Sequence, residues 1–485
     1  MLFTEPTFLF LFLPLLLALY FISFSREHAT YGNVLLLIAS VVFYAKGGGP
    51  FTWLMLASIA FNYWMAIAID RARPTSENTA KRLLALAIGV DLLVLGIFKY
   101  ANFFAANVNT LFLALRIQPV VVPRVLLPIG ISFFTFHAVS YVVDVYRRDA
   151  VAQKSPVHAA LYLLLFPQLI AGPIIRYRDI ADQLARRRVA LDDFAYGVRR
   201  FIIGLAKKVL VANVVAGPAD KIFALPADQL TTALAWLGVI CYTLQIYFDF
   251  SGYSDMAIGL GRMFGFRFPE NFRWPYIACT VQEFWRRWHI SLSTWFLDYL
   301  YVPLGGNRVS ARRMYGNLVT VFFLCGLWHG ASWNFVVWGL FHGTFLVIER
   351  LGVAAFVERL WRPLRHVYLL LVVMVGWVFF RADSLTTAVV FLKAMAGATS
   401  AVMPPYAPAW YLTPELWIAL VVGAIGSTPV VPALARWSET AIASGRAALR
   451  FGIDTASTAA LGVLLLASIM QMAARTYNPF IYFRF

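Results

Sequence analysis

Charged residues are scarce in this sequence: Asp, Glu, Lys and Arg make up 13% of the 485 residues, whereas hydrophobic residues make up 61%. Soluble globular proteins typically carry about 25% charged residues, so this composition excludes that class. A disordered chain is excluded as well, because disorder requires low hydrophobicity. The composition therefore predicts a protein that crosses a membrane several times.

Cysteine clusters and the common cofactor motifs are also missing. The three cysteines, Cys241, Cys279 and Cys325, are widely spaced, which argues against a disulfide framework and favours packing roles. The sequence has no HExxH, GxGxxG, GxxxxGK[ST] or GxSxG pattern. We therefore expect no metal site, no phosphate-binding loop and no serine-hydrolase elbow.

Long apolar segments recur along the whole chain. A membrane-spanning helix needs about 20 apolar residues, and by this measure the sequence predicts about 11 to 13 spans, some of them re-entrant or interfacial. The first segment lacks the basic region and cleavage site of a signal peptide, so it is predicted to be a membrane helix. With no internal repeat, the simplest organisation is one integral membrane domain over residues 1–485.

The charge balance is strongly basic, with 41 Lys and Arg against 24 Asp and Glu and a net charge of +17. The basic residues fall between apolar spans, which favours topology signals of a membrane protein over nucleic-acid binding. Loops 70–82 and 147–154 are both predicted to face the cytoplasm, and the N-terminus the other side.

Residues 176–208 form the most charged stretch, and two interpretations remain open for it. A cytoplasmic loop that fixes topology is one. A binding site for a polyanionic donor molecule is the other, because clustered Lys and Arg suit phosphates. The run Arg186, Arg187 and Arg188 is the candidate for such a site.

Residues 262–313 mix Trp, Tyr and Phe with Arg and Glu and are too polar for a simple span. Such a composition is typical of helices at the membrane interface or lining a cavity. The following stretch, 314–349, is predicted to form two membrane helices.

His329 is the ionisable residue that stands out by position, in LCGLWHGASWNF. Counted from Leu318 at 1.5 Å per residue, it lies roughly 16 Å into a hydrocarbon core of about 30 Å. An ionisable group at that depth is a candidate functional residue, although a hydrogen bond to a neighbouring helix is the alternative. Gly330 and the polar Ser332 and Asn334 then interrupt the helix.

The sequence gives weaker evidence of a functional role for the other histidines. His289, in EFWRRWHISLSTW, is compatible either with a functional role or with simple exposure at the interface. His137 and His342 lie within spans and are predicted to hydrogen-bond neighbouring helices. Intramembrane acids are few and the two halves show no symmetry, which argues against a proton-coupled transporter.

Several motifs resemble the membrane-bound O-acyltransferase family. They are LPIGISFFTFHAVSYVVDVYR (128–147), FPQLIAGPIIRY (166–177), YFDFSGYSDMAIGLGRMFGF (247–266), NFRWPYIACTVQEFWRRWHISLSTWFLDYLYVPLGGNR (271–308), LWHGASWNFVVWGLFHG (327–343) and YNPFIYFRF (477–485). The run over 271–308 is more similar to the alginate O-acetyltransferase branch than to the D-alanyl transferases of teichoic acid. The resemblance implies an all-α polytopic fold with a central funnel, in the bacterial inner membrane.

The resemblance also implies a reaction. Cytoplasmic acetyl-CoA would be the donor, with no tightly bound cofactor. The acceptor would be a hydroxyl group of a periplasmic partner protein in a polysaccharide-modification complex, or of an exopolysaccharide such as alginate. Membrane lipid is an expected partner and nucleic acid is not. D-alanyl or other acyl transfer to a cell-wall polymer is the alternative reaction. A channel or a secretion-complex subunit without catalysis is the alternative of another class.

The family's catalytic histidine corresponds to His329, which we expect to act as the base, and its second polar residue to His289. His289 would orient the acceptor, shuttle protons or polarise the thioester carbonyl. Histidine suits proton transfer near neutral pH because its unperturbed pKa is about 6.5. Ser332 and Asn334 are expected as supporting hydrogen-bond donors, and Arg186, Arg187 and Arg188 as contacts of the donor's phosphates.

Overall fold

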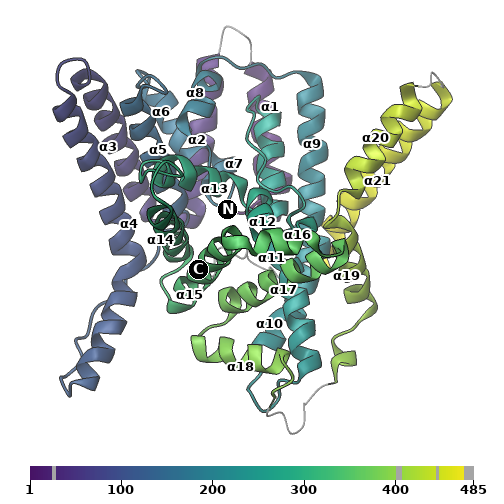
Figure 1. The fold of residues 1–485 in the computed structure, drawn as a ribbon. Coiled ribbons are helices and arrows are strands. Elements are labelled where there is room, and N and C mark those ends of the chain that lie inside the picture. The colour runs from purple at the N-terminus through teal and green to yellow at the C-terminus, as the bar shows by residue number, and fades with distance from the viewer. Residues whose placement is uncertain (24–28, 400–406, 444–446, 475–485) are drawn as a thin grey trace. The chain divides into compact units, whose positions relative to one another are not determined.

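The computed structural model describes residues 1–23, 29–399, 407–443 and 447–474, and these residues form helices and no strands (Figure 1). This confirms the all-α fold. The motif at 477–485 lies outside the described residues. The helices are η1 (Phe8–Phe12), α1 (Leu13–Ser23), α2 (Ala29–Gly48), α3 (Phe51–Ala72), α4 (Glu77–Ala114), α5 (Ile131–Arg147), α6 (Pro156–Leu164), α7 (Phe166–Leu169), α8 (Tyr177–Ala185), α9 (Leu191–Ala206), η2 (Lys207–Ala212), α10 (Asn213–Phe223), α11 (Thr232–Met263), η3 (Pro275–Ile277), α12 (Val281–Arg287), α13 (Ile290–Phe296), η4 (Leu297–Tyr301), α14 (Ala311–His329), α15 (Trp333–Ile348), η5 (Glu349–Val353), α16 (Ala354–Arg359), α17 (Arg362–Arg381), α18 (Leu385–Met395), η6 (Pro408–Trp410), α19 (Pro414–Gly426), α20 (Val430–Ala443) and α21 (Ala447–Ala474).

Among the described residues, eight helices are long and apolar enough to cross a membrane, or up to nine if the bent pair α19 and α20 forms one span. The protein is therefore a multi-pass membrane protein. The count is below the predicted 11 to 13 because several expected spans are short or interrupted. The expected span over 157–175, for example, ends as a helix at Leu164 and continues as the four-residue α7.

The chain forms two compact units, residues 1–198 with 257–269, and residues 199–256 with 270–485. The expectation of one integral membrane domain remains a prediction. Each unit has its own packing, and the segment 262–313 contributes to both. Within the second unit that segment contains the short helices η3, α12, α13 and η4, and η4 directly follows α13.

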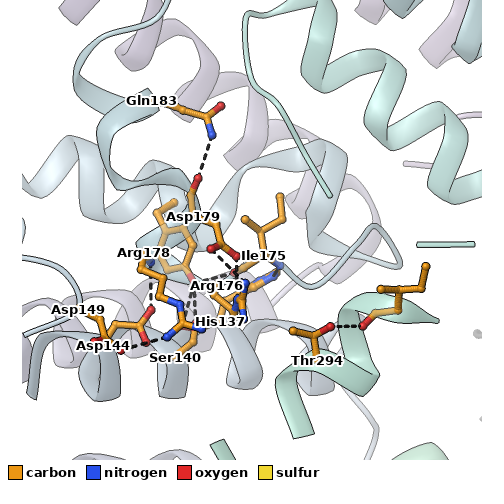
Figure 2. A network of polar contacts seen from close by, with 12 residues as sticks. His137, Ser140, Asp144, Asp149, Ile175, Arg176, Arg178, Asp179, Gln183 and Thr294 are labelled. Atoms are coloured by element: carbon orange, nitrogen blue, oxygen red, sulfur yellow. Dashed lines mark hydrogen bonds and ion pairs between the residues drawn. The ribbon is translucent and has the colours of Figure 1, made fainter. Parts of the chain in front are cut away.

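In the first unit, polar side chains hold the segment between α7 and α8 in place (Figure 2). His137 on α5 accepts a hydrogen bond at Nε2 from the backbone N–H of Ile175, 3.2 Å away. Asp144, also on α5, accepts from the backbone N–H of Arg178 at 3.0 Å. His137 therefore bonds the non-helical segment before α8 rather than a neighbouring helix, which had been predicted.

In the second unit, α14 and α15 pack through glycine. A Cβ atom on Gly326 would lie 2.3 Å from the carbonyl oxygen of Phe335, and a Cβ on Gly339 would lie 2.2 Å from that of Phe322. Small residues let helix backbones approach this closely, which is a common way to pack helices in membranes. The close approach fixes the end of α14, where His329 lies.

Buried and partly buried ion pairs link Arg200 of α9 and the lysines of η2 to α11 in the same unit. Lys208 and Asp249 lie 2.9 Å apart, with side chains 4% and 3% exposed. Lys207 pairs with Asp255 at 2.6 Å, and Arg200 pairs with the same carboxylate at 2.7 Å. Polar side chains in a membrane helix are costly unless paired, so these contacts account for the charges within α11.

Candidate active site

His329 is the last residue of α14, and its side chain is 5% exposed. The helix ends there because Gly330 adopts an extended conformation. A Cβ atom on Gly330 would lie 2.1 Å from the ring of Phe335, so a larger residue cannot take this position without movement. The chain turn therefore places a histidine at a helix end that is buried among protein atoms.

Three aromatic rings surround His329. The ring centroids of Trp328, Trp338 and Phe380 lie 4.8, 4.9 and 5.1 Å from that of the imidazole, all at steep interplanar angles of 74°, 84° and 75°. These rings come from α14, α15 and α17, respectively. Such packing limits rotation of the imidazole and excludes water from its surroundings.

Ser332 and Asn334 shape the loop after His329. The Ser332 hydroxyl accepts a hydrogen bond from the backbone N–H of Asn334 at 3.1 Å and caps α15. The buried Asn334 side chain donates from Nδ2 to the carbonyl oxygen of Ala382, which follows α17. These bonds tie the start of α15 to the end of α17, next to the aromatic rings around His329.

His289 lies between α12 and α13 and is 1% exposed, so the alternative of an exposed interfacial histidine is wrong. Its backbone is left-handed, with φ 43° and ψ 54°, a conformation that is uncommon for residues other than glycine. Its Nδ1 lies 3.1 Å from Oδ1 of Asn271, and its ring lies 4.6 Å from that of Phe250. Burial lowers the pKa of His289 to about 3, because the charged form is poorly solvated there, so the ring is neutral at neutral pH.

Trp328 brings the two histidines into one site. Its ring centroid lies 6.2 Å from that of His289 and 4.8 Å from that of His329. Two buried imidazoles next to one indole provide proton-accepting and proton-donating groups in a dry environment. The arrangement suits a reaction in which a proton must leave one group and return to another.

Asn271, Trp328 and Trp338 are site residues that the sequence reasoning missed. Asn271 belongs to the motif-bearing run over 271–308, but nothing in its spacing to His289 reveals a contact. It is 1% exposed and accepts hydrogen bonds from His289 and from the hydroxyl of Ser291. The tryptophans look in sequence like ordinary apolar packing residues.

His342 was predicted to hydrogen-bond a neighbouring helix, and among the described residues the structure does not show this bond. It is fully buried on α15, and within the described part of the chain neither ring nitrogen has a hydrogen-bond partner. Its ring instead packs 5.2 Å from Trp285 and 5.3 Å from Trp338. Nε2 lies close to Gly376 of α17, where a Cβ atom would be 2.6 Å away. The close approach of α15 and α17 leaves room for the ring but not for a further polar side chain.

The three arginines expected at the donor's phosphates have different environments in the first unit. Arg186 and Arg188 are exposed. Arg187 donates to Asn33 Oδ1 at 2.6 Å and to the Phe264 carbonyl oxygen at 3.0 Å, and its guanidinium lies 4.3 Å from the ring centroid of Phe266. Arg187 therefore has a structural role, and the exposed pair is better placed to meet a solute.

Other cations of the charged stretch are neutralised locally. Arg176 pairs with Asp179 at 2.7 Å, and Arg178 pairs with Asp149 at 3.0 Å (Figure 2). Among the described residues no group of three or more His, Cys, Asp or Glu side chains could hold a metal ion.

Comparison with known proteins adds a family assignment to this geometry. Residues 94–390 match the model of the family described as MBOAT, membrane-bound O-acyltransferase. A probable alginate O-acetylase of Azotobacter vinelandii is 45% identical, and one of Pseudomonas putida is 43% identical, each over 100% of both chains. A peptidoglycan O-acetyltransferase of Helicobacter pylori is 37% identical over 82% of this chain and 80% of its own. The match spans both units and includes His289 and His329.

Proposed function

Because the chain belongs to the membrane-bound O-acyltransferase family and is an acyltransferase, we propose that it transfers an acetyl group from acetyl-CoA to an extracytoplasmic hydroxyl group. The acceptor is a polysaccharide such as alginate or a periplasmic protein that passes the acetyl group on to it. The observation that carries this proposal is the pair of buried histidines that contact Trp328. The names of the full-length relatives support acetyl as the transferred group.

The reaction needs a proton acceptor and a group that stabilises negative charge. The acceptor's hydroxyl oxygen attacks the thioester carbonyl carbon, a C–O bond forms and the C–S bond breaks. The hydroxyl proton must leave, and the departing thiolate must take up a proton to give the free thiol. His329 and His289 are the two buried groups that can exchange these protons, and the family resemblance assigns the base to His329.

The aromatic surroundings support this chemistry. Trp328, Trp338 and Phe380 keep bulk water away from His329, which protects the thioester from hydrolysis. Ser332 and Asn334 hold the loop and the start of α15 near these rings, so their contribution is to position the site.

The donor and the acceptor approach from opposite sides of the bacterial inner membrane in this proposal. Acetyl-CoA is highly anionic and cytoplasmic, so its phosphates require cytoplasmic cations. The exposed Arg186 and Arg188 are candidates for that contact. In this proposal they lie on the cytoplasmic side, together with the basic loops 70–82 and 147–154. The slim pantetheine arm would carry the acetyl group toward the histidines.

Transfer of D-alanine or another acyl group to a cell-wall polymer is the alternative reaction, and the two have different donors. Purified protein in proteoliposomes would be given acetyl-CoA labelled in the acetyl group, together with an alginate acceptor or the periplasmic extract. We expect labelled acetyl ester in the wild type and none in the His329→Ala variant. Turnover with an aminoacyl thioester but not with acetyl-CoA would favour the alternative, and turnover with neither donor would favour a non-catalytic role.

A further inference from the structure

The buried amide of Asn271 is held in one orientation by its surroundings. Its Oδ1 faces the backbone N–H of Ser291 at 3.2 Å and the Ser291 hydroxyl at 2.9 Å, while its Nδ2 donates to the hydroxyl of Ser254 at 3.0 Å. A backbone N–H can only donate, so the atom facing it must be the amide oxygen. The oxygen end of Asn271 is therefore the end that meets His289.

This orientation determines the tautomer of His289. An amide oxygen is only an acceptor, so the His289 Nδ1 that lies 3.1 Å away must carry a proton. A neutral imidazole has one protonated nitrogen, and the other has a lone pair. In His289 that other nitrogen is Nε2, which is buried and has no hydrogen-bond partner within the described residues.

We infer that Asn271 is a positioning residue that fixes His289 as the Nδ1-protonated tautomer, so that its Nε2 is a second proton acceptor in the same site as the base His329. The inference rests on the proposed acyl transfer at this site. The hydroxyl proton moves to His329 as the C–O bond forms, and it reaches the thiolate sulfur through Nε2 of His289 after the C–S bond breaks. Neutral His289 has no Nε2 proton with which to polarise the thioester carbonyl, so of the roles expected for it the proton shuttle is the one that this tautomer supports.

The arrangement follows the logic of the serine-protease triad, in which a side-chain oxygen holds Nδ1–H and leaves Nε2 as the base. Here the oxygen belongs to a neutral amide rather than a carboxylate. The backbone N–H of Ile290 also donates to the backbone carbonyl of Asn271 at 2.9 Å, so the two segments are joined by both main chain and side chain. The left-handed backbone at His289 directs the ring into this contact.

The ring's own surroundings are apolar, with Phe250, Phe272 and Trp328 around it. The charged and titratable groups on the neighbouring elements include Asp249 with Lys208, Asp255 with Arg200 and Lys207, Glu270 with Arg200, Glu283 with Arg287, together with Arg273, Arg286, His329, Tyr247, Tyr253, Tyr276 and Cys325. Desolvation is the cause that lowers the pKa of His289, so a new charge at position 271 would be the dominant electrostatic change.

The test compares Asn271→Asp with Asn271→Ala. A carboxylate at position 271 still accepts from Nδ1–H and favours the charged imidazolium, so it raises the pKa of His289. We expect Asn271→Asp to retain activity and to shift the acidic limb of its kcat/KM profile toward higher pH. Asn271→Ala loses the acceptor, and we expect kcat to fall by about 10²-fold or more with little change in KM.

Matched variants separate this role from simple packing. Asn317 is also a buried asparagine of the second unit and donates to the carbonyl oxygen of Leu304, so Asn317→Asp and Asn317→Ala measure the cost of changing a buried amide elsewhere. If Asn271→Asp fails to fold, Asn271→Ser takes its place as the small uncharged variant. We expect Asn271→Ser to fold and to lose kcat as the alanine variant does.

Two results would overturn the inference. One is wild-type kcat in the folded Asn271→Ala or Asn271→Ser protein. The other is equal inactivity of Asn271→Asp and Asn271→Ala with no shift in the pH profile. If His289→Ala is inactive in the same assay, either result leaves the proposed acyl transfer intact. If His289→Ala has wild-type activity, the proposed site itself is wrong.

Discussion

Gly339 on α15 lies against Gly326 on α14 so closely that a Cβ atom on Gly339 would be 3.1 Å from the Cα atom of Gly326. The two helices therefore meet through their backbones, one turn before His329. Trp338, which packs on His329, is the residue directly before Gly339. The close approach of the two helices therefore determines how Trp338 packs on His329.

Gly339→Ala should separate α14 from α15 and move Trp338 away from His329. The new methyl group would be 2.2 Å from the carbonyl oxygen of Phe322, a backbone atom that cannot rotate away. We expect reduced thermal stability and a loss of acyl transfer that exceeds the loss of folded protein. The measurement is kcat per folded molecule together with the melting temperature in detergent.

Gly316→Ala is the control for this prediction. Gly316 is also on α14, but nothing lies within 4 Å of its Cβ position. Alanine is favoured over glycine in helices by about 0.5–1 kcal/mol, so we expect equal or slightly higher stability and unchanged activity. Similar behaviour of the two variants would refute the role assigned to the helix crossing.

Substitution of the exposed Arg186 and Arg188 should change the kinetics with acetyl-CoA, whereas substitution of the structural Arg187 should change stability. Arg186→Gln with Arg188→Gln should raise KM for acetyl-CoA and weaken its dependence on salt, because phosphate contacts are electrostatic. Arg187→Gln should instead lower stability, since it removes the bonds to Asn33 and Phe264. An unchanged KM at low salt in the double variant would remove Arg186 and Arg188 from the donor site.

The effects on stability of substituting the buried ion-pair partners Lys208 and Asp249 should be strongly non-additive. Removing one partner leaves an uncompensated buried charge, which in proteins typically costs about 3–5 kcal/mol, whereas removing both is often much less costly. We expect Lys208→Met and Asp249→Leu each to lower the melting temperature more than the double variant does. Additive losses in the double variant would show that the two side chains act independently.

Topology can be tested with cysteine labelling in a background without Cys241, Cys279 and Cys325. Asn78, exposed in the loop region 70–82, is predicted to be cytoplasmic, so Asn78→Cys should resist a membrane-impermeant maleimide in spheroplasts. Gln118, exposed after α4, is the matched position on the other side, and Gln118→Cys should be labelled. Reversed labelling would invert the predicted orientation.

The all-helical membrane fold and His329 could be predicted because both depend on local signals. Long apolar runs determine the first, and an ionisable residue inside one of them reveals the second. The interruption of the expected span over 157–175 was harder to predict, because the polar contacts that support it come from distant residues such as His137.

The remaining site residues could not be predicted for a similar reason. Asn271 and His289 are 18 positions apart, and their hydrogen bond depends on a left-handed turn that no composition reveals. Arg187 looks in sequence identical to its two neighbours, yet it alone of the three turns toward Asn33 and Phe264. Burial and tertiary contact, rather than residue type, separate these roles.

The most direct test of the account is the rate of acetyl transfer from labelled acetyl-CoA by purified protein, compared between wild type and His329→Ala at equal amounts of folded protein. Loss of proton-transfer help typically costs about 10²–10⁴-fold in rate, so we predict a fall of that size with an unchanged melting temperature. A His329→Ala protein that is folded and acetylates its acceptor at the wild-type rate would contradict the account.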